Sequence, residues 1–266
     1  MSRSNVQLLF RFVPLLTLAV TFIAGCSVSF SSKPVAGKCT KSPEEHWASV
    51  LSTFVDSGGK VNFAAVALNS TDLECYVEYL QETAPWNKPT SFNSKAEETA
   101  FFINAYNALA MFGVVKKGIP ADFDSDLKRA DFFYLTNYTL GGRSLSLYQF
   151  ENEIVRPLGE PRVHFALNCM SVGCPRLPTI PYTADALEQQ LQNGAREFFN
   201  SSKYVVVDAS RKVVTVSEIL KFYPEDFVKP GVASSLIEFI NKYRDASVPT
   251  DYQVEYIPYD WHVNKQ

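Results

Sequence analysis

The stretch Ser94–Lys117 reads SKAEETAFFINAYNALAMFGVVKK, and it decides what kind of fold the rest of the chain can build. Ser94 stands where a helix N-cap is expected, with a glutamate three residues later. Lys116 and Lys117 follow the apolar run, where positive charge favours a helix C-terminus. Nearly every residue from 100 to 115 is apolar, so this helix has no solvent face. The sequence therefore predicts a domain assembled around one buried helix.

Two amide side chains interrupt the apolar run. Asn104 and Asn107 are three residues apart and share one face of the predicted helix. A buried amide without hydrogen-bond partners costs about 2 kcal/mol or more, so both must find partners. We expect them to brace a neighbouring loop. The alternative is a place in a functional site, with Asn104 orienting a catalytic group and Asn107 binding a ligand.

The segments on either side of this helix predict an α+β fold. Capping signals predict further helices before and after it, which begin near residues 42, 70, 146, 183, 217 and 233. Alternating apolar residues and turn signals predict strands, which cover 132–140, 143–145, 162–168, 204–208, 212–216 and 252–257. Helices come mostly first and strands later. We therefore expect a single α+β domain in which a largely antiparallel sheet packs against helices.

The first 25 residues have the features of a bacterial secretion signal. Arg3 and Arg11 supply positive charge, and a short apolar run ends in the sequence Ile23-Ala24-Gly25-Cys26. This ending resembles a lipobox, which predicts cleavage before Cys26 and lipidation of Cys26. Because Ser27 follows and not aspartate, we expect anchoring at the outer membrane. The alternative is an ordinary secreted protein in which Cys26 is incidental.

Residues 26–41 are polar and predict a flexible tether to a domain that covers residues 42–266. Removal of residues 1–25 changes the net charge from −3 to −5, because two basic residues and no acidic residue are lost. An acidic domain argues against a nucleic-acid partner. The expected partners are the membrane, through the lipid, and an exported protein or cell-wall component.

The stretch Arg162–Leu177 reads RVHFALNCMSVGCPRL and gathers reactive side chains. It brings His164 within ten residues of both Cys169 and Cys174, where a predicted strand runs into a loop. A cysteine nucleophile needs a base that makes the thiolate and a third group that orients the base. One reading is therefore catalytic: Cys169 or Cys174 as nucleophile and His164 as base, in acyl transfer or in amide or ester hydrolysis.

The orienting group in this reading is Asp260 or Asn104, while Asn168 and Arg176 are candidate binding residues. Side chains alternate along a strand, so His164 and Cys169 would point to opposite faces unless the chain turns after Asn168. No metal site or cofactor is expected, because the chain has no CxxC, HExxH, Walker A or GxGxxG sequence.

The cysteines allow a second reading. With Cys26 lipidated, four thiols remain, and in an oxidising compartment we prefer the pairs Cys39–Cys75 and Cys169–Cys174. A bridged Cys169–Cys174 pair has no thiolate and cannot act as a nucleophile. The domain would then bind an exported partner or a cell-wall component without catalysis.

Four separated blocks carry a family resemblance. They are FFINAYNAL (101–109), RVHFALNCMSVGCPRL (162–177), FYPEDF (222–227) and YIPYDW (256–261). In this order they resemble the domain of unknown function 547 family, over residues 45–262. The resemblance implies an exported protein or lipoprotein, and it implies no established activity. A distant kinship with papain-like and transglutaminase-like cysteine enzymes is suggested by analogy of fold.

Overall fold

Helix α4 (Lys95–Lys116) forms the centre of the larger hydrophobic cluster, as the sequence predicts. The computed structural model describes residues 28–33 and 37–266, so the expected signal and Cys26 lie outside the described residues. Ser94 caps α4 by accepting a hydrogen bond from the backbone N–H of Glu97. Every residue of α4 from Thr99 to Val114 is buried. The helix therefore packs against neighbours on all sides, as its composition requires.

Among the described residues, three α-helices precede α4 and pack beside it. They are α1 (Pro43–Phe54), α2 (Phe63–Leu68) and α3 (Thr71–Glu82). Ser42 and Glu45 form the capping box predicted for α1. Trp47 of α1 stacks on Tyr76 of α3 with ring centroids 5.5 Å apart, and both rings are buried. Helix α2 was not expected, because its six residues are too few for a periodic pattern.

Two three-stranded sheets flank the helices, and each contains a predicted hairpin. The first has the order β1 (Val28–Phe30), β2 (Thr136–Leu140), β3 (Arg143–Ser146), and the second has the order β4 (Val205–Asp208), β5 (Val213–Ser217), β6 (Gln253–Ile257). The β2–β3 and β4–β5 pairs are antiparallel, while β1 and β6 add in parallel. The α+β class is confirmed, but the sheets are small and mixed rather than one largely antiparallel sheet.

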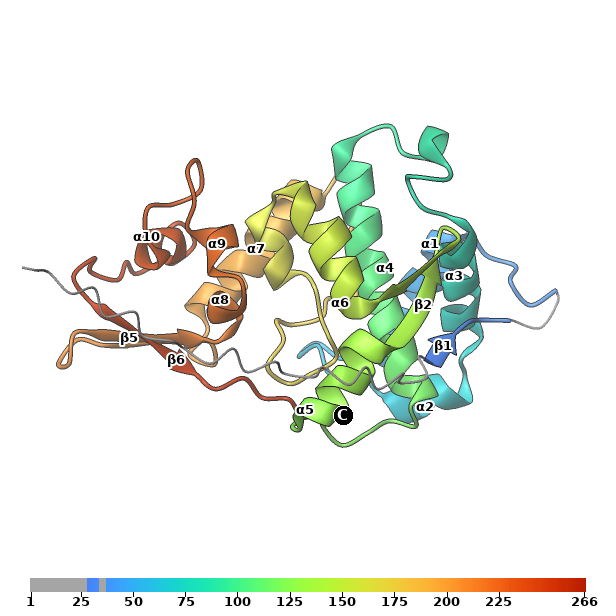
Figure 1. Ribbon diagram of the computed structural model, residues 1–266, viewed down its shortest axis with the longest axis horizontal. Coiled ribbons are helices and arrows are strands. Elements are labelled where there is room, and N and C mark those ends of the chain that lie inside the picture. Colours follow the sequence, from blue (N-terminus) through green and yellow to red (C-terminus); the bar gives the residue numbers. More distant parts are fainter. Residues whose placement is uncertain (1–27, 34–36) are drawn as a thin grey trace, which may run out of the picture.

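The C-terminal helices build a second hydrophobic cluster around Phe165, Phe199 and Phe239. These helices are α7 (Leu187–Asn200), α8 (Ile219–Phe222), α9 (Pro224–Phe227) and α10 (Leu236–Asn241). Figure 1 shows β5, β6 and α8–α10 at one end of an elongated molecule and α1–α3 toward the other, with α4 between them. Within the described ranges, no helix combines the length and apolar character of a membrane span.

Short irregular helices also occur between the longer elements. They are α5 (Asp126–Arg129) and α6 (Leu147–Gln149), each continued by a π-helical turn over Ala130–Leu135 and Phe150–Val155, and the 3₁₀ helices Pro89–Ser91, Arg156–Leu158 and Pro161–Phe165. The strand predicted over 162–168 is therefore wrong. Pro161 occupies the start of a helical turn, and the Glu160 carboxylate caps it by accepting from Arg162 N–H. These local signals outweigh the apolar run that suggested a strand.

Candidate functional site

A cavity of about 540 Å³ lies at the junction between the two hydrophobic clusters. Its walls come from α4, α5, both π-helical turns, the 166–175 loop, α8 and the segment after β6. The residues that line it are Tyr106, Asp126, Arg129, Ala130, Phe133, Tyr134, Tyr148, Glu151, His164, Leu167, Cys169, Cys174, Pro175, Ile219, Phe222, Tyr223, Tyr259 and Trp261. Three of the five candidate catalytic residues, His164 and the two cysteines, therefore meet in one cavity.

Two buried asparagines hold the loop that carries the cysteines. The Asn107 amide donates to the Ala166 carbonyl at 3.0 Å and accepts from Asn168 N–H at 2.7 Å. The Asn168 amide in turn donates to the Pro175 carbonyl at 2.7 Å and accepts from Met170 N–H at 2.8 Å. Both side chains are 1% exposed, so neither is free to bind a ligand. Both brace the loop, as expected for Asn107, whereas the sequence suggested Asn168 only as a binding residue.

Asn104 braces a different segment. Its amide oxygen accepts from Trp47 Nε1 at 3.2 Å and from Tyr182 N–H at 3.0 Å. Its amide nitrogen donates to the Tyr182 carbonyl at 2.8 Å. These hydrogen bonds hold the backbone at Tyr182 in place. The structure does not place Asn104 against His164.

The two cysteines of the loop are free thiols in contact with each other. Cys169 Sγ and Cys174 Sγ lie 2.8 Å apart, and the expected bridge between them is not formed. The other expected bridge, Cys39–Cys75, is present. Tyr259 Oη lies 3.2 Å from Cys169 Sγ and 3.0 Å from Cys174 Sγ. The site is therefore a dithiol with a phenol hydroxyl across both sulfurs.

The surroundings of the dithiol separate the pKa values of its two members. Burial opposes ionisation of Cys169, but hydrogen bonds from Cys174, Ser171 and Tyr259 outweigh it and lower the pKa of Cys169 to about 7. Burial and the neighbouring Cys169 raise the pKa of Cys174 well above its ordinary value. Burial and both sulfurs also raise the pKa of Tyr259. At pH 7 about half of Cys169 is thus thiolate, while Cys174 and Tyr259 keep their protons.

The segment after β6 holds Tyr259 against the loop. Val172 N–H donates to the His262 carbonyl at 2.7 Å, and Gly173 N–H donates to the Asp260 carbonyl at 2.8 Å. The Tyr259 ring lies so close to Gly173 that a Cβ atom at this position would stand 2.9 Å from three ring carbons. Glycine is therefore required here for the ring to reach the sulfurs.

His164 belongs to a separate charged cluster on the cavity wall. Its Nε2 lies 2.8 Å from an Asp226 carboxylate oxygen, and its Nδ1 lies 3.8 Å from Glu151. Asp226 also accepts from Arg156 Nε at 2.6 Å. Burial opposes ionisation of Asp226, but the bonds from His164 and Arg156 hold its pKa well below the ordinary range. Burial raises the pKa of Glu151. Among the described residues, His164 hydrogen-bonds to neither Cys169 nor Cys174.

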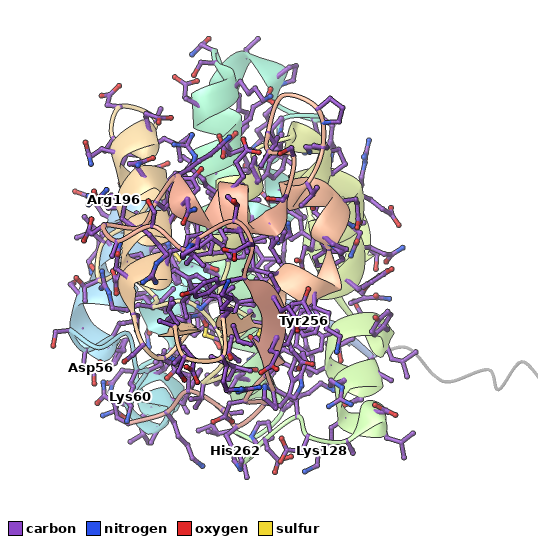
Figure 2. The ribbon with its side chains drawn as sticks, turned by 90° about the vertical axis from the view of Figure 1, so that its left-hand side faces the viewer. Asp56, Lys60, Lys128, Arg196, Tyr256 and His262 are labelled. Carbon is purple, nitrogen blue, oxygen red and sulfur yellow. A yellow bond between two sulfur atoms is a disulfide. The ribbon has the colours of Figure 1, made fainter. Side chains whose placement is uncertain are left out.

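Two predicted site residues lie away from this chemistry. The Asp260 carboxylate accepts from His262 N–H at 3.0 Å and pairs with His262 Nδ1 at 2.8 Å, so it orients His262 and not His164. Arg176 pairs with Glu197 beside a second, smaller cavity of about 240 Å³. Figure 2 shows His262 and Lys128 near each other at one edge of the molecule.

Sequence reasoning missed three residues of the site: Tyr259, Asp226 and Glu151. Tyr259 lies in the block YIPYDW and Asp226 in the block FYPEDF, both of which carry the family resemblance. Those blocks contain the signal that these residues belong to the site. Glu151 has no comparable signal, since it is one of two acidic residues in the Phe150–Val155 turn.

The fold and the cavity together define an α+β protein with a buried dithiol site. Residues 89–199 match the family model described as protein of unknown function, DUF547. The matched segment includes α4, His164 and both cysteines of the loop, and it supports the family resemblance there. No curated protein and no solved structure matches the chain.

Proposed function

We propose that the protein is a cysteine-dependent acyl hydrolase or transferase in which Cys169 attacks an amide or ester carbonyl. One observation carries the proposal: a free thiol with a pKa of about 7 lies on the wall of a cavity of about 540 Å³. A thiolate near neutral pH is what nucleophilic catalysis by cysteine needs. Structural cysteines buried in apolar surroundings have raised pKa values, so the lowered value at Cys169 favours chemistry.

The proposed reaction has two steps. The Cys169 thiolate attacks the carbonyl carbon, an S–C bond forms, and the C–N or C–O bond to the leaving group breaks as an acid protonates that group. Cys174 and Tyr259 both carry a proton near neutral pH and lie within 3.2 Å of Cys169 Sγ, so either is placed to supply it. Water then attacks the thioester: one of its protons returns to the deprotonated Cys174 or Tyr259, the S–C bond breaks, and the carboxylic acid product leaves with the Cys169 thiolate restored. An amine or alcohol in place of water makes the reaction a transfer.

In this proposal His164 is a positioning residue. Its hydrogen bond to Asp226 and its proximity to Glu151 join the 150–155 turn to α9 across the cavity wall. The thiolate is stabilised by hydrogen bonds from its own loop and from Tyr259, so it needs no imidazole beside it. The classical cysteine–histidine pair expected from the sequence is therefore replaced by a cysteine–cysteine–tyrosine arrangement.

The cavity wall favours substrates with flat apolar faces. Tyr134 and Tyr148 stack with centroids 4.4 Å apart, and both are partly exposed. The ring centroids of Tyr259 and Trp261 lie 4.4 Å apart on the same cavity wall. Aromatic side chains of this kind pack against sugar rings and apolar acyl chains. We propose an envelope peptide or glycan-linked substrate.

The proposed setting is the bacterial cell envelope, with the domain anchored by a lipid at Cys26. The Cys39–Cys75 disulfide supports this setting, because structural disulfides persist in oxidising compartments. Fractionation of cells tests the lipid anchor. We expect the protein to stay in the membrane fraction after a high-salt wash, and Cys26→Ser to be lost from that fraction.

A second candidate is a non-catalytic domain that binds an exported partner or a cell-wall component. The observation in its favour is that His164 hydrogen-bonds to Asp226 and to neither sulfur. The histidine that usually acts as base in cysteine enzymes therefore does not contact the thiol. In this case the cavity binds its ligand, and the thiols do not form an acyl intermediate.

A covalent-trapping experiment separates the two candidates. The protein is incubated with p-nitrophenyl esters of short and long acids and with N-acyl amino acid esters, quenched in acid, and mapped by mass spectrometry. We expect an acyl group on Cys169 in the parent, and none in a folded Cys169→Ala variant. Quenching of tryptophan fluorescence by these compounds in the parent and not in Trp261→Phe, without any adduct on Cys169, would reject catalysis and favour the binding role.

A further inference from the structure

A second cluster of sulfur and imidazole lies in the region of α1 and α3, and none of its residues lines the cavity. It consists of Cys39 and Cys75, which form the disulfide, and His46. A ring nitrogen of His46 and the two sulfurs all lie within 4.8 Å of one another. His46 is near the start of α1 and Cys75 is near the start of α3, so two packed helices fix their positions.

His46 has one ring nitrogen engaged and one free. Nδ1 lies 2.6 Å from Asp72 Oδ1, and a carboxylate only accepts hydrogen bonds, so the proton of a neutral ring is on Nδ1. Nε2 then carries a lone pair. It is buried, the residue is only 3% exposed, and Nε2 has no hydrogen-bond partner among the described residues. A buried acceptor without a partner costs free energy and needs an explanation.

The Asp72–His46 pair has the arrangement that orients histidine ligands in metal sites. A ligating histidine usually donates its other ring N–H to a carboxylate, which fixes the tautomer and increases the basicity of the ligating nitrogen. Here Asp72 is itself held by Lys41 Nζ at 3.0 Å. Glu78 Oε2 lies 3.9 Å from Cys39 Sγ and offers an oxygen ligand. Two thiolates, one imidazole and one carboxylate or water make a four-coordinate site for a thiophilic divalent cation.

We propose that reduction of the Cys39–Cys75 disulfide turns this cluster into a metal site for a thiophilic divalent cation such as Zn²⁺, with both cysteines and His46 Nε2 as ligands. A dithiol reductant supplies two electrons and two protons, breaks the S–S bond and leaves as its own cyclic disulfide. Metal binding then releases the two thiol protons as two S–metal bonds and one N–metal bond form. Disulfide and metal are thus alternative cross-links between residue 39 and α3.

The local structure allows this exchange. Cys39 is exposed and lies outside the helices, so its side chain can rotate away from Cys75 while His46 and Cys75 stay in place. The reductant also has direct access to the exposed Cys39. The inference rests on the Cys39–His46–Cys75 cluster alone and does not depend on the function proposed for Cys169.

Cobalt titration tests the proposal in a Cys169→Ser/Cys174→Ser background, which removes the other dithiol. The protein is reduced, freed of reductant under argon, and titrated with Co²⁺ while the thiolate-to-cobalt charge-transfer absorption is recorded. We expect one Co²⁺ per chain, full displacement by Zn²⁺, and no such absorption in the oxidised protein. We expect Cys39→Ser to abolish the absorption and His46→Gln to weaken binding at least about 100-fold, by loss of a metal ligand.

Two controls keep the outcome clear. His262→Gln changes an exposed histidine that pairs with Asp260, and it should leave Co²⁺ binding unchanged. If His46→Gln does not fold, Asp72→Asn replaces it, with an expected loss of about 10- to 100-fold. Zn²⁺ should also raise the Tm of the reduced protein and not that of the oxidised protein. Either of two results would overturn the proposal. One is a folded, reduced protein that shows no charge-transfer absorption with Co²⁺. The other is that His46→Gln and Asp72→Asn bind Co²⁺ as tightly as the background protein.

Discussion

The phenol of Tyr259 contributes to the lowered pKa of Cys169, after the larger contributions of Cys174 and Ser171, and Tyr259→Phe measures how much. The Tyr259 hydroxyl lies 3.2 Å from Cys169 Sγ and is one of three side-chain groups whose hydrogen bonds lower the pKa of Cys169 to about 7. A hydrogen bond to a charged group contributes about 1.5 kcal/mol, and 1.36 kcal/mol corresponds to about one pKa unit. We therefore expect the pKa of Cys169 to rise to about 8 in the variant. At pH 7 the thiolate fraction then falls from about one half to about one tenth.

The assay is the pH dependence of iodoacetamide alkylation, with the modified cysteine located by tandem mass spectrometry. In the parent, the rate at Cys169 should rise as pH increases through about 7. At pH 7, Tyr259→Phe should react about fivefold more slowly, because the thiolate is the reacting form.

Tyr204→Phe is the matched control. Its hydroxyl donates to the Cys174 carbonyl at 2.6 Å, so the substitution removes a buried hydrogen bond from the same loop and leaves both sulfurs with their partners. We expect the control to lower stability by about 1 kcal/mol and to keep the alkylation profile of Cys169. Equal profiles for the parent and Tyr259→Phe would refute the role given to the phenol.

Four further substitutions test hydrogen bonds at the site and packing on α4. Asp226→Asn removes the carboxylate bonded to His164 and should cost about 2 kcal/mol in urea unfolding at pH 7. Because the folded-state pKa of Asp226 lies below its unfolded value of about 4, this difference should shrink as pH falls below 4, and a pH-independent difference would contradict the ion pair. Asn107→Ala leaves two buried backbone groups of the thiol loop unpaired, so we expect the free energy of unfolding to fall by about 3 kcal/mol. We also expect a higher pKa for Cys169. An unchanged alkylation profile of Cys169 would show that the loop keeps its shape without the amide. Gly113→Ala would place a Cβ atom 2.0 Å from the hydroxyl of Tyr138, which is buried and has no hydrogen-bond partner among the described residues. Tyr138→Phe alone should raise Tm slightly. In the double variant, Tyr138→Phe should also recover part of the stability that Gly113→Ala loses. Strictly additive effects of the two substitutions in thermal unfolding would argue against this clash.

The predicted elements that survive are those whose signals are local. The capping serine and the all-apolar run define α4, and Gly141-Gly142 with its flanking residues defines the β2–β3 hairpin. The failure over 162–168 is also local: an apolar run of this length fits either a strand or a buried turn, and Pro161 decided for the turn. The parallel pairing of β1 with β2 joins segments more than a hundred residues apart, so no local pattern indicates it.

The candidate site shows the same division. Cys169 and Cys174 are five residues apart, and the sequence correctly brings them together in one loop. Tyr259 reaches them from 85 residues beyond Cys174, and Asp226 reaches His164 from 62 residues away. Sequence reasoning placed Asp260 in the site, one residue from the side chain that contacts the sulfurs. Which of two adjacent residues faces the cavity depends on how the segment after β6 packs, and spacing alone does not determine it.

The distance along the chain between the dithiol and Tyr259 has a consequence for oxidative folding. Cys39 and Cys75 are 36 residues apart and belong to the α1–α3 region, so they can meet before residue 169 has entered the fold. Until Tyr259 docks and the loop folds, Cys169 has the acidity of an ordinary thiol and competes equally for any oxidant. An oxidant that acts early therefore pairs the N-terminal cysteines correctly. The same oxidant acting on a chain in which Cys39, Cys75, Cys169 and Cys174 are all exposed can form any of three pairings among these four, of which one joins Cys39 to Cys75.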